Sequence, residues 1–378
     1  MEAGDDSVTM TSSISQLYPV VPGAKLVLVR VLLTSLPIHS HLMPTMVPLA
    51  RAFRQRGHEA VIATGPAMAH LEHTVVMPDI SAPSDLGPPP PWIPERDGVL
   101  KVPLWSDALV VASAANILDF ARTWRPDVIV RETSEYGGQI AAEVLGIPHA
   151  LIDIAPFAPL EIPLLDELVD KVRARFQVGA TEPVLTAGLT PASWHPAQHH
   201  FRVPIEQGDE DEGPEIVASF GTNAQWLMPG STLPHVVVEA LGEVSARAVV
   251  AIGHGAWTGP RPSNVRLAPE IPQQRLLGTA KVFVTHAGYS GVREALTAGV
   301  PMVAMPLFAD QPRNADRIQD LGVGVRVDVK GLTATVLAER IQHVLNTRRY
   351  HDAAENLAAQ TIDLEVFTSI PDHLVSAV

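Results

Sequence analysis

The stretch Phe283-Val284-Thr285-His286-Ala287-Gly288-Tyr289-Ser290-Gly291-Val292-Arg293-Glu294-Ala295-Leu296 reads as a strand, a turn and a helix. Its apolar start is typical of a strand buried in a parallel sheet, and this strand would end at His286. The start of the helix would offer unpaired backbone N–H groups and a partial positive charge, which suit a phosphate. Gly288 and Gly291 would let the backbone approach such an anion, and His286 could donate a hydrogen bond to it. Glycine turns of this kind are common, so the spacing alone does not identify the ligand.

The next strand and turn add polar side chains of another kind. Met302-Val303-Ala304-Met305 predicts a second buried strand, and the turn after it carries Asp310 and Gln311. A carboxylate accepts hydrogen bonds, whereas an amide both accepts and donates them, so the pair suits adjacent hydroxyl groups such as those of a sugar.

Strands and helices alternate in both halves of the chain. Residues 26–35 predict a buried strand, a helix with an apolar stripe begins between Thr45 and Pro48, and residues 59–63 begin another strand. The alternation restarts at residues 216–219. The expected fold class is α/β, with two Rossmann-like, doubly wound parallel-sheet domains facing a cleft into which the strand ends open.

Changes in composition suggest the domain boundaries. Residues 1–24 predict a disordered tail, and residues 25–185 and 214–360 predict the two domains. The proline-rich residues 186–213 predict a linker. Residues 361–378 predict a C-terminal helical segment that packs back toward the first domain.

Composition excludes several classes of protein. Of the 378 residues, 46% are hydrophobic and 18% are charged, as in globular chains. The 27 Lys and Arg against 41 Asp and Glu give a net charge of −14, which argues against binding to nucleic acid. The lack of cysteine excludes disulfides and thiolate chemistry. No stretch reaches the roughly 18 apolar residues of a membrane span and no secretory signal is apparent, so we expect a cytoplasmic protein.

Two weaker motifs have ordinary explanations. The acidic run Asp209-Glu210-Asp211-Glu212 contains a D-x-D triplet that could hold a metal ion, but no apolar strand precedes it, which favours a solvated linker. Gly253-His254-Gly255 lacks the third glycine of a dinucleotide fingerprint and reads as a loop. We therefore predict no metal site and no cofactor.

Residues 283–324 resemble the donor-site signature of nucleotide-sugar-dependent glycosyltransferases of family 1, which have the GT-B fold, especially those that modify bacterial natural products. The unit at residues 26–63 and the segment 216–222 extend the resemblance over most of residues 26–360. The resemblance implies that the first domain binds the acceptor and the second binds the nucleotide sugar.

The resemblance also implies which residues contact the phosphates of the donor. His286, with the turn that contains Gly288, Ser290 and Gly291, would hold the diphosphate. Thr222 matches a residue whose hydroxyl contacts phosphate from the other side.

Four further residues are implied in binding the rest of the donor. Asp310 and Gln311 match a pair that binds hydroxyls of the donor sugar, and Glu294 matches a residue that reaches the ribose. Ile271 lies beside the position of the base. The family usually has Trp where this chain has Glu270, so we expect Ile271 to contact the base through its backbone.

Three other positions depart from the pattern of the family. Gly291 and Val292 stand where Ser or Thr is usual, so the hydroxyl contact would come from Ser290 instead. Ala287 replaces a frequent Gly.

On the acceptor side, His39-Ser40-His41-Leu42-Met43-Pro44 resembles the Gly-His-x-x-Pro turn of the family. His41, three residues before Pro44, would be the general base, since a neutral imidazole can accept a proton near pH 7. Glu132 stands where the family has the acidic residue that orients this His. His39 is the alternative base, and Glu135 is the alternative orienting residue.

The implied reaction is inverting transfer of a sugar, such as a deoxysugar, from a dTDP- or UDP-sugar to a hydrophobic natural product such as a polyketide. His286 and the helix start would stabilise the departing diphosphate without a metal. Trp92, beside a run of prolines, is the candidate acceptor contact. C-glycosylation and a homodimer are left open.

Two other functions remain open at this point. The same fold could carry a nucleotide-sugar 2-epimerase, which would need more carboxylates in the cleft and would not depend on an acceptor. A catalytically silent relative that binds sugar nucleotide or activates a partner transferase would explain the changes at Glu270, Gly291 and Val292.

Overall fold

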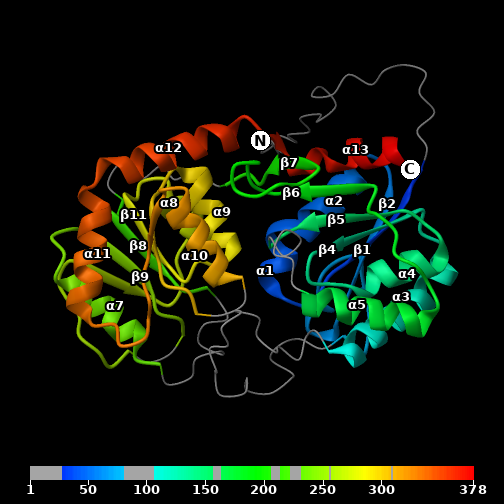
Figure 1. The fold of residues 1–378 in the computed structure, drawn as a ribbon, viewed down its shortest axis with the longest axis horizontal. Coiled ribbons are helices and arrows are strands. Elements are labelled where there is room, and N and C mark those ends of the chain that lie inside the picture. Colours follow the sequence, from blue (N-terminus) through cyan, green and yellow to red (C-terminus); the bar gives the residue numbers. More distant parts are fainter. Residues whose placement is uncertain are drawn as a thin grey trace, which may run out of the picture.

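The structure, a computed structural model, describes residues 28–80, 106–155, 163–205, 213–221, 231–254, 257–307 and 310–378. The tail predicted at residues 1–24 lies outside these ranges. The described chain forms two parallel sheets, one in each half of the molecule, and helices cover both faces of each sheet (Figure 1). The predicted α/β class with two parallel-sheet domains is confirmed.

Within the described residues, the first sheet has eight parallel strands in the order β3-β2-β1-β4-β5-β6-β7-β14. The strands are β1 (Arg30–Thr34), β2 (Glu59–Thr64), β3 (Thr74–Val76), β4 (Val128–Glu132), β5 (His149–Asp153), β6 (Leu185–Gly188), β7 (His199–Arg202) and β14 (Glu365–Val366). Side chains alternate between the two faces of the sheet. Leu33 therefore packs on the side of α2 (Val47–Gln55) and α13 (Ile370–Ala377), whereas Leu32 packs on the side of α3 (Asp107–Trp124).

The second sheet, over the same described ranges, has six parallel strands in the order β10-β9-β8-β11-β12-β13. The strands are β8 (Ile216–Ser219), β9 (Ala248–Ala251), β10 (Val265–Ala268), β11 (Val282–Thr285), β12 (Met302–Ala304) and β13 (Gly324–Arg326). The helices are α7 (Leu233–Gly242), α8 (Gln273–Leu277), α9 (Tyr289–Ala298), α10 (Gln311–Asp320), α11 (Ala334–Asn346) and α12 (Arg348–Ile362). One face packs on α7 and α11, and the other packs on α8, α9 and α12.

Both sheets reverse their strand order at one point. In the first sheet the chain moves outward from β1 to β3 and then returns to β4, beside β1; the second does the same at β8 and β11. Ligands of doubly wound proteins bind in the crevice at such switch points, beyond the carboxyl ends of the strands. The residues that end or follow β1, β4, β8 and β11 are therefore placed to form the site. α1 (His39–His41), which follows β1, lies on the side of the first domain that faces the second (Figure 1).

The prediction of a linker over residues 186–213 is wrong as far as residue 202, because most of β6 and all of β7 lie in this range and belong to the first sheet. β7 reads His-His-Phe-Arg with only Phe201 buried, so its sequence carries no apolar pattern. It pairs through its backbone near the edge of the sheet. The β6–β7 loop (residues 189–198) also reaches the second domain, where Trp194 is buried in a cluster with Val217 and Phe283.

The chain ends on the first domain. α12 runs along the top of the molecule from the second domain toward the first (Figure 1). After it, β14 pairs with β7, and Arg56 on the first domain makes hydrogen bonds of 2.7 Å to both carboxylate oxygens of Asp372 on α13. None of the helices in the described ranges has both the length and the apolar character needed to cross a lipid bilayer.

Candidate functional site

The turn after β1 places His41 at the first switch point. The chain passes from α1 through a π-helical turn, η2 (Leu42–Met46), into α2. Pro44 and Pro48 have no N–H to donate, so a regular α-helix would leave carbonyls unpaired here. Wider turns of this kind often occur at functional sites. The Thr45 hydroxyl donates to the His41 carbonyl and so fixes the backbone of His41.

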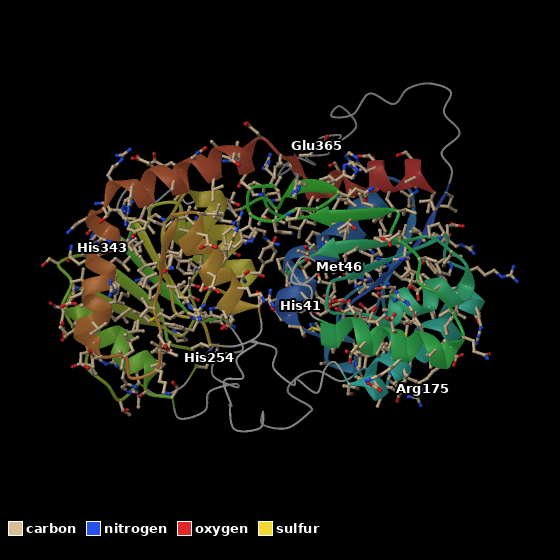
Figure 2. All side chains as sticks on the ribbon, viewed as in Figure 1. His41, Met46, Arg175, His254, His343 and Glu365 are labelled. Carbon is tan, nitrogen blue, oxygen red and sulfur yellow. The ribbon has the colours of Figure 1, made fainter. Side chains whose placement is uncertain are left out.

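His41 and Glu132 lie together. Nδ1 of His41 is 3.3 Å from Oε1 of Glu132, and the side chain of Glu132 is fully buried, whereas 21% of that of His41 is exposed. Glu132 also accepts hydrogen bonds from the amides of Leu36 (3.2 Å) and Ser134 (2.6 Å). The carboxylate is thus held in place and orients the imidazole, whose Nε2 has no hydrogen-bond partner among the described residues. Figure 2 shows His41 on the side of the first domain that faces the second.

The environment of Glu132 favours its charged form. Burial acts to raise its pKa, but the charge of His41, its hydrogen bond and the two amide hydrogen bonds outweigh burial and lower the pKa of Glu132. A charged carboxylate at this position would stabilise a protonated His41.

The carboxylate of Glu135 makes its hydrogen bonds to groups other than His41. Its two oxygens accept hydrogen bonds from the hydroxyls of Thr34 (2.6 Å) and Ser113 (2.7 Å) and from the amides of Gly137 (2.7 Å) and Gly138 (2.8 Å). These amides begin α4 (Gly137–Leu145), so Glu135 caps that helix. His39, the alternative base, is exposed.

In the second domain, His286 lies at the other switch point, between two glycines. A Cβ atom on Gly221, which follows β8, would lie 3.0 Å from Cε1 of His286, and one on Gly288 would lie 2.4 Å from its Nε2. Burial lowers the pKa of His286 to about 4. The imidazole is therefore neutral near pH 7.

α9 begins beside this imidazole. Its N-cap residue, Gly288, has no side chain to cap the helix, and the amide of Tyr289 donates to Asp310 at 3.2 Å. The amides of Ser290 and Gly291 have no partner elsewhere in the described chain. Ala287 adopts a left-handed backbone with φ of 63°, which explains why the family often has glycine there.

The side chains of Asp310 and Gln311 already accept hydrogen bonds from neighbouring residues of the second domain. Oδ2 of Asp310 accepts hydrogen bonds from the Tyr289 amide and from Nδ2 of Asn314 (2.6 Å), and Oε1 of Gln311 accepts from the Leu307 amide at 2.8 Å. Burial raises the pKa of Asp310, and the positive charge of His41 is among the effects that oppose the shift. His41 of the first domain is thus close enough to Asp310 of the second for their charges to interact.

Glu294 and Ile271, the residues predicted to lie beside the nucleoside, are linked by hydrogen bonds through α8. Glu294 accepts hydrogen bonds from the side-chain amides of Gln273 (2.6 Å) and Gln274 (3.0 Å) on α8, and the carbonyl of Ile271 accepts from the amide of Gln273 (2.8 Å). Gln273 ends the stretch 270–273 that resembles the base-flanking segment of the family, but neither Gln273 nor Gln274 was predicted as a site residue.

Glu270, where the family has Trp, makes an exposed ion pair of 2.8 Å with His254, which is labelled in Figure 2. The structure thus places a hydrogen-bonded His–Glu pair, and no aromatic ring, at residue 270, next to Ile271 in the sequence.

Other predicted residues lie outside the described ranges: Thr222, Trp92, and the Asp209–Asp211 triplet. Across the ranges that are described, no three His, Asp or Glu side chains gather as metal ligands.

A set of buried polar residues between the domains was not predicted from the sequence: Asp153, Thr190, His195 and Tyr289. The only signal for them was an aspartate that ends the otherwise apolar strand Ala150-Leu151-Ile152-Asp153.

Comparison with known sequences supports the assignment of the C-terminal half. Residues 186–365 match the family described as UDP-glucoronosyl and UDP-glucosyl transferase. UDP-glucuronosyltransferase 1A7 of Rattus norvegicus is 30% identical over 246 residues, which are 60% of this chain and 43% of that protein. The chain therefore spans less than half the length of the curated relatives it matches.

Solved structures match nearly the whole chain. The spinosyn rhamnosyltransferase SpnG is 24% identical with a TM-score of 0.75, and the match covers 92% of this chain and 100% of that one. The glycosyltransferase VinC in complex with DTDP is 21% identical with a TM-score of 0.71, covering 92% and 99%. The predicted GT-B fold is thereby confirmed.

Proposed function

We propose that this chain, whose residues 186–365 match the family described as UDP-glucoronosyl and UDP-glucosyl transferase, is an inverting glycosyltransferase. It transfers a sugar from a nucleoside diphosphate, dTDP or UDP, to a hydroxyl group of a hydrophobic small molecule. The observation that most supports the proposal is the pair of facing switch points. One carries an oriented His–Glu pair, and the other carries a neutral His at an uncapped helix start.

On the acceptor side, the free Nε2 of His41 takes the proton of the acceptor hydroxyl as its oxygen attacks the anomeric carbon. Glu132 holds Nδ1–H of the ring and stabilises the imidazolium that forms. A similar pairing of a buried carboxylate with an imidazole base operates in other enzymes. The name of SpnG, a spinosyn rhamnosyltransferase, supports a hydrophobic natural product such as a polyketide as the acceptor, in line with the implied role of the first domain.

On the donor side, the diphosphate leaves toward the start of α9. The amides of Ser290 and Gly291, the helix dipole and an N–H of His286 stabilise its growing negative charge. Because these groups already offset that charge, we expect transfer to persist in EDTA. Glu294 with Gln273 serves the ribose, and Asp310 and Gln311 serve the sugar.

A direct test incubates the protein with dTDP- and UDP-sugars, with and without a panel of phenolic and polyketide alcohols. We expect the release of nucleoside diphosphate to depend on the acceptor and to match the glycoside formed. Conversion of the nucleotide sugar without an acceptor would instead indicate an epimerase. Binding without any turnover would indicate a silent relative. Cell fractionation tests the cytoplasmic location that we propose.

A further inference from the structure

A chain of buried hydrogen bonds crosses from the first domain to α9. Asp153 ends β5, and its Oδ2 lies 2.8 Å from Nε2 of His195. Nδ1 of His195 lies 3.2 Å from Oγ1 of Thr190, which lies 3.0 Å from the hydroxyl of Tyr289. All four residues are at most 5% exposed. We call this chain the interdomain relay.

The hydrogen-bond roles in the relay are mutually consistent. Burial raises the pKa of the Tyr289 phenol, so it stays protonated and can donate to Thr190. The Thr190 hydroxyl then donates to Nδ1 of His195, and Nε2–H of His195 donates to Asp153. This assignment satisfies each group, which matters because an unpaired buried polar group costs more than the net gain from one hydrogen bond.

Each end of the relay lies next to a proposed site residue. At the first-domain end, the other oxygen of Asp153 accepts from the Thr133 hydroxyl at 3.0 Å, and Thr133 directly follows Glu132. At the other end, the backbone amide of Tyr289 donates to Asp310 and begins α9. The relay therefore connects the strand end that orients His41 with the helix start that faces the diphosphate.

The β6–β7 loop, which carries Thr190 and His195, is attached to both domains. Its Trp194 is buried in the core of the second domain, and Arg317 on α10 donates to the carbonyls of Trp194 (2.8 Å) and Ser193 (2.5 Å). Its His195 bonds back to Asp153 of the first domain. The loop is thus attached to the first domain by its flanking strands β6 and β7 and by the relay, and to the second domain by Trp194 and Arg317.

A hydrolytic role for the Thr–His–Asp part of the relay is unsupported. The Thr190 hydroxyl would be the nucleophile, but Thr190 is 1% exposed and its oxygen already faces Tyr289. No acyl substrate could reach it.

We propose that the relay sets the position of α9 relative to His41, so that Tyr289, Thr190 and His195 are positioning residues for sugar transfer. The proposal rests on the proposed function for its effect on turnover. Its structural part, the coupling of the loop to α9 through the Tyr289 hydroxyl, does not depend on the proposed function.

The test compares Tyr289→Phe, which removes only the hydroxyl, with the control Tyr350→Phe. Tyr350 is also buried, and its hydroxyl contacts Arg349 (3.0 Å) and His343 (3.3 Å) within the second domain. For Tyr289→Phe we expect kcat to fall about 3- to 10-fold, the effect of one hydrogen bond, while the Kd for dTDP or UDP by calorimetry stays within about twofold. Tyr350→Phe should change neither quantity.

A double-mutant cycle with Thr190→Val checks that the two hydroxyls act together. If they do, Thr190→Val with Tyr289→Phe should lower kcat no further than Thr190→Val alone. Independent, multiplicative losses would overturn the relay.

Hydrogen exchange of the free enzyme tests the coupling without any assay of transfer. Tyr289→Phe should speed exchange in residues 189–195, where the Trp194 amide bonds to the Pro191 carbonyl, and Tyr350→Phe should not. Unchanged exchange with unchanged kcat would overturn the proposal, as would equal losses in nucleotide affinity and kcat. If the parent protein transfers no sugar, the proposed function fails, and the exchange result still decides whether the loop is coupled to α9.

Discussion

The buried Glu132 carboxylate holds one ring nitrogen of His41 and leaves the other to the acceptor. Sequence could identify both residues as candidates through the resemblance to family 1 glycosyltransferases, and the structure places them at a switch point. Sequence could not separate Glu132 from Glu135, which lie in one turn. Only the path of the backbone decides that Glu132 faces α1 while Glu135 caps α4.

Glu132→Gln should lower kcat about tenfold, because a neutral amide stabilises the imidazolium less than a carboxylate does. This loss corresponds to one charge-assisted hydrogen bond, worth roughly 1.5 kcal/mol. Steady-state kinetics measure it. Glu135→Gln is the control from the same turn. It should lower the melting temperature through the cap of α4 while leaving the pH profile of kcat unchanged, and a larger kinetic effect there would reverse the two roles.

His286 should make the protein sensitive to mild acid. Its pKa falls from 6.5 to about 4 on folding, so below pH 6.5 the unfolded chain binds a proton that the folded chain does not. The stability linked to His286 is complete above pH 6.5 and is lost as the pH falls toward 4. By pH 5 the loss should be about 2 kcal/mol.

Urea unfolding of the parent and of His286→Gln at pH 7 and pH 5 measures this loss. The parent should lose about 2 kcal/mol more than the variant between the two values. Equal losses would mean that His286 is not buried as described.

At the scale of elements, the buried strands were predictable because long apolar runs fit only the interior of a parallel sheet. Ile216–Ser219 and Val282–Thr285 form as predicted. β7 was not predictable, since its His-His-Phe-Arg sequence has no pattern and its pairing comes from the neighbouring β6. The interdomain relay could not be predicted from the sequence either, because its residues are far apart in the chain.

Substitutions of two glycines in the turn into α9, Gly291 and Gly288, should have different effects on nucleotide binding. A Cβ atom on Gly291 would lie 3.4 Å from Phe283 and 3.5 Å from Gln273, which are ordinary contacts, so Gly291→Ser should be accepted. It should stabilise the helix by about 0.5 kcal/mol and keep nucleotide affinity. A Cβ atom on Gly288 would lie 2.4 Å from Nε2 of His286, so Gly288→Ala should displace the imidazole and weaken dTDP or UDP binding.

Thermal unfolding of the two variants measures their stability, and calorimetry measures their affinity for dTDP or UDP. Nucleotide binding that Gly288→Ala leaves intact would show that the position of His286 does not matter to the donor.

At the scale of the whole molecule, the two domains share one structural feature but are proposed to have different roles. Each places a histidine at the switch point of its sheet, and the charge of His41 reaches Asp310 across the space between the domains. Their surroundings make the two histidines different: Glu132 orients His41, whereas His286 is packed neutral between glycines. We therefore expect the proton-accepting group and the donor-binding groups to be separable by mutation.

The most direct measurement is the kcat of His41→Ala set beside its Kd for the nucleoside diphosphate. Since a general base contributes about 10²–10⁴-fold, kcat toward an ordinary alcohol should fall by that factor, while the Kd stays within about twofold. An acidic phenol, which needs less help to lose its proton, should recover part of the rate. Transfer to an ordinary alcohol at the parent rate would contradict the role of His41 as the base.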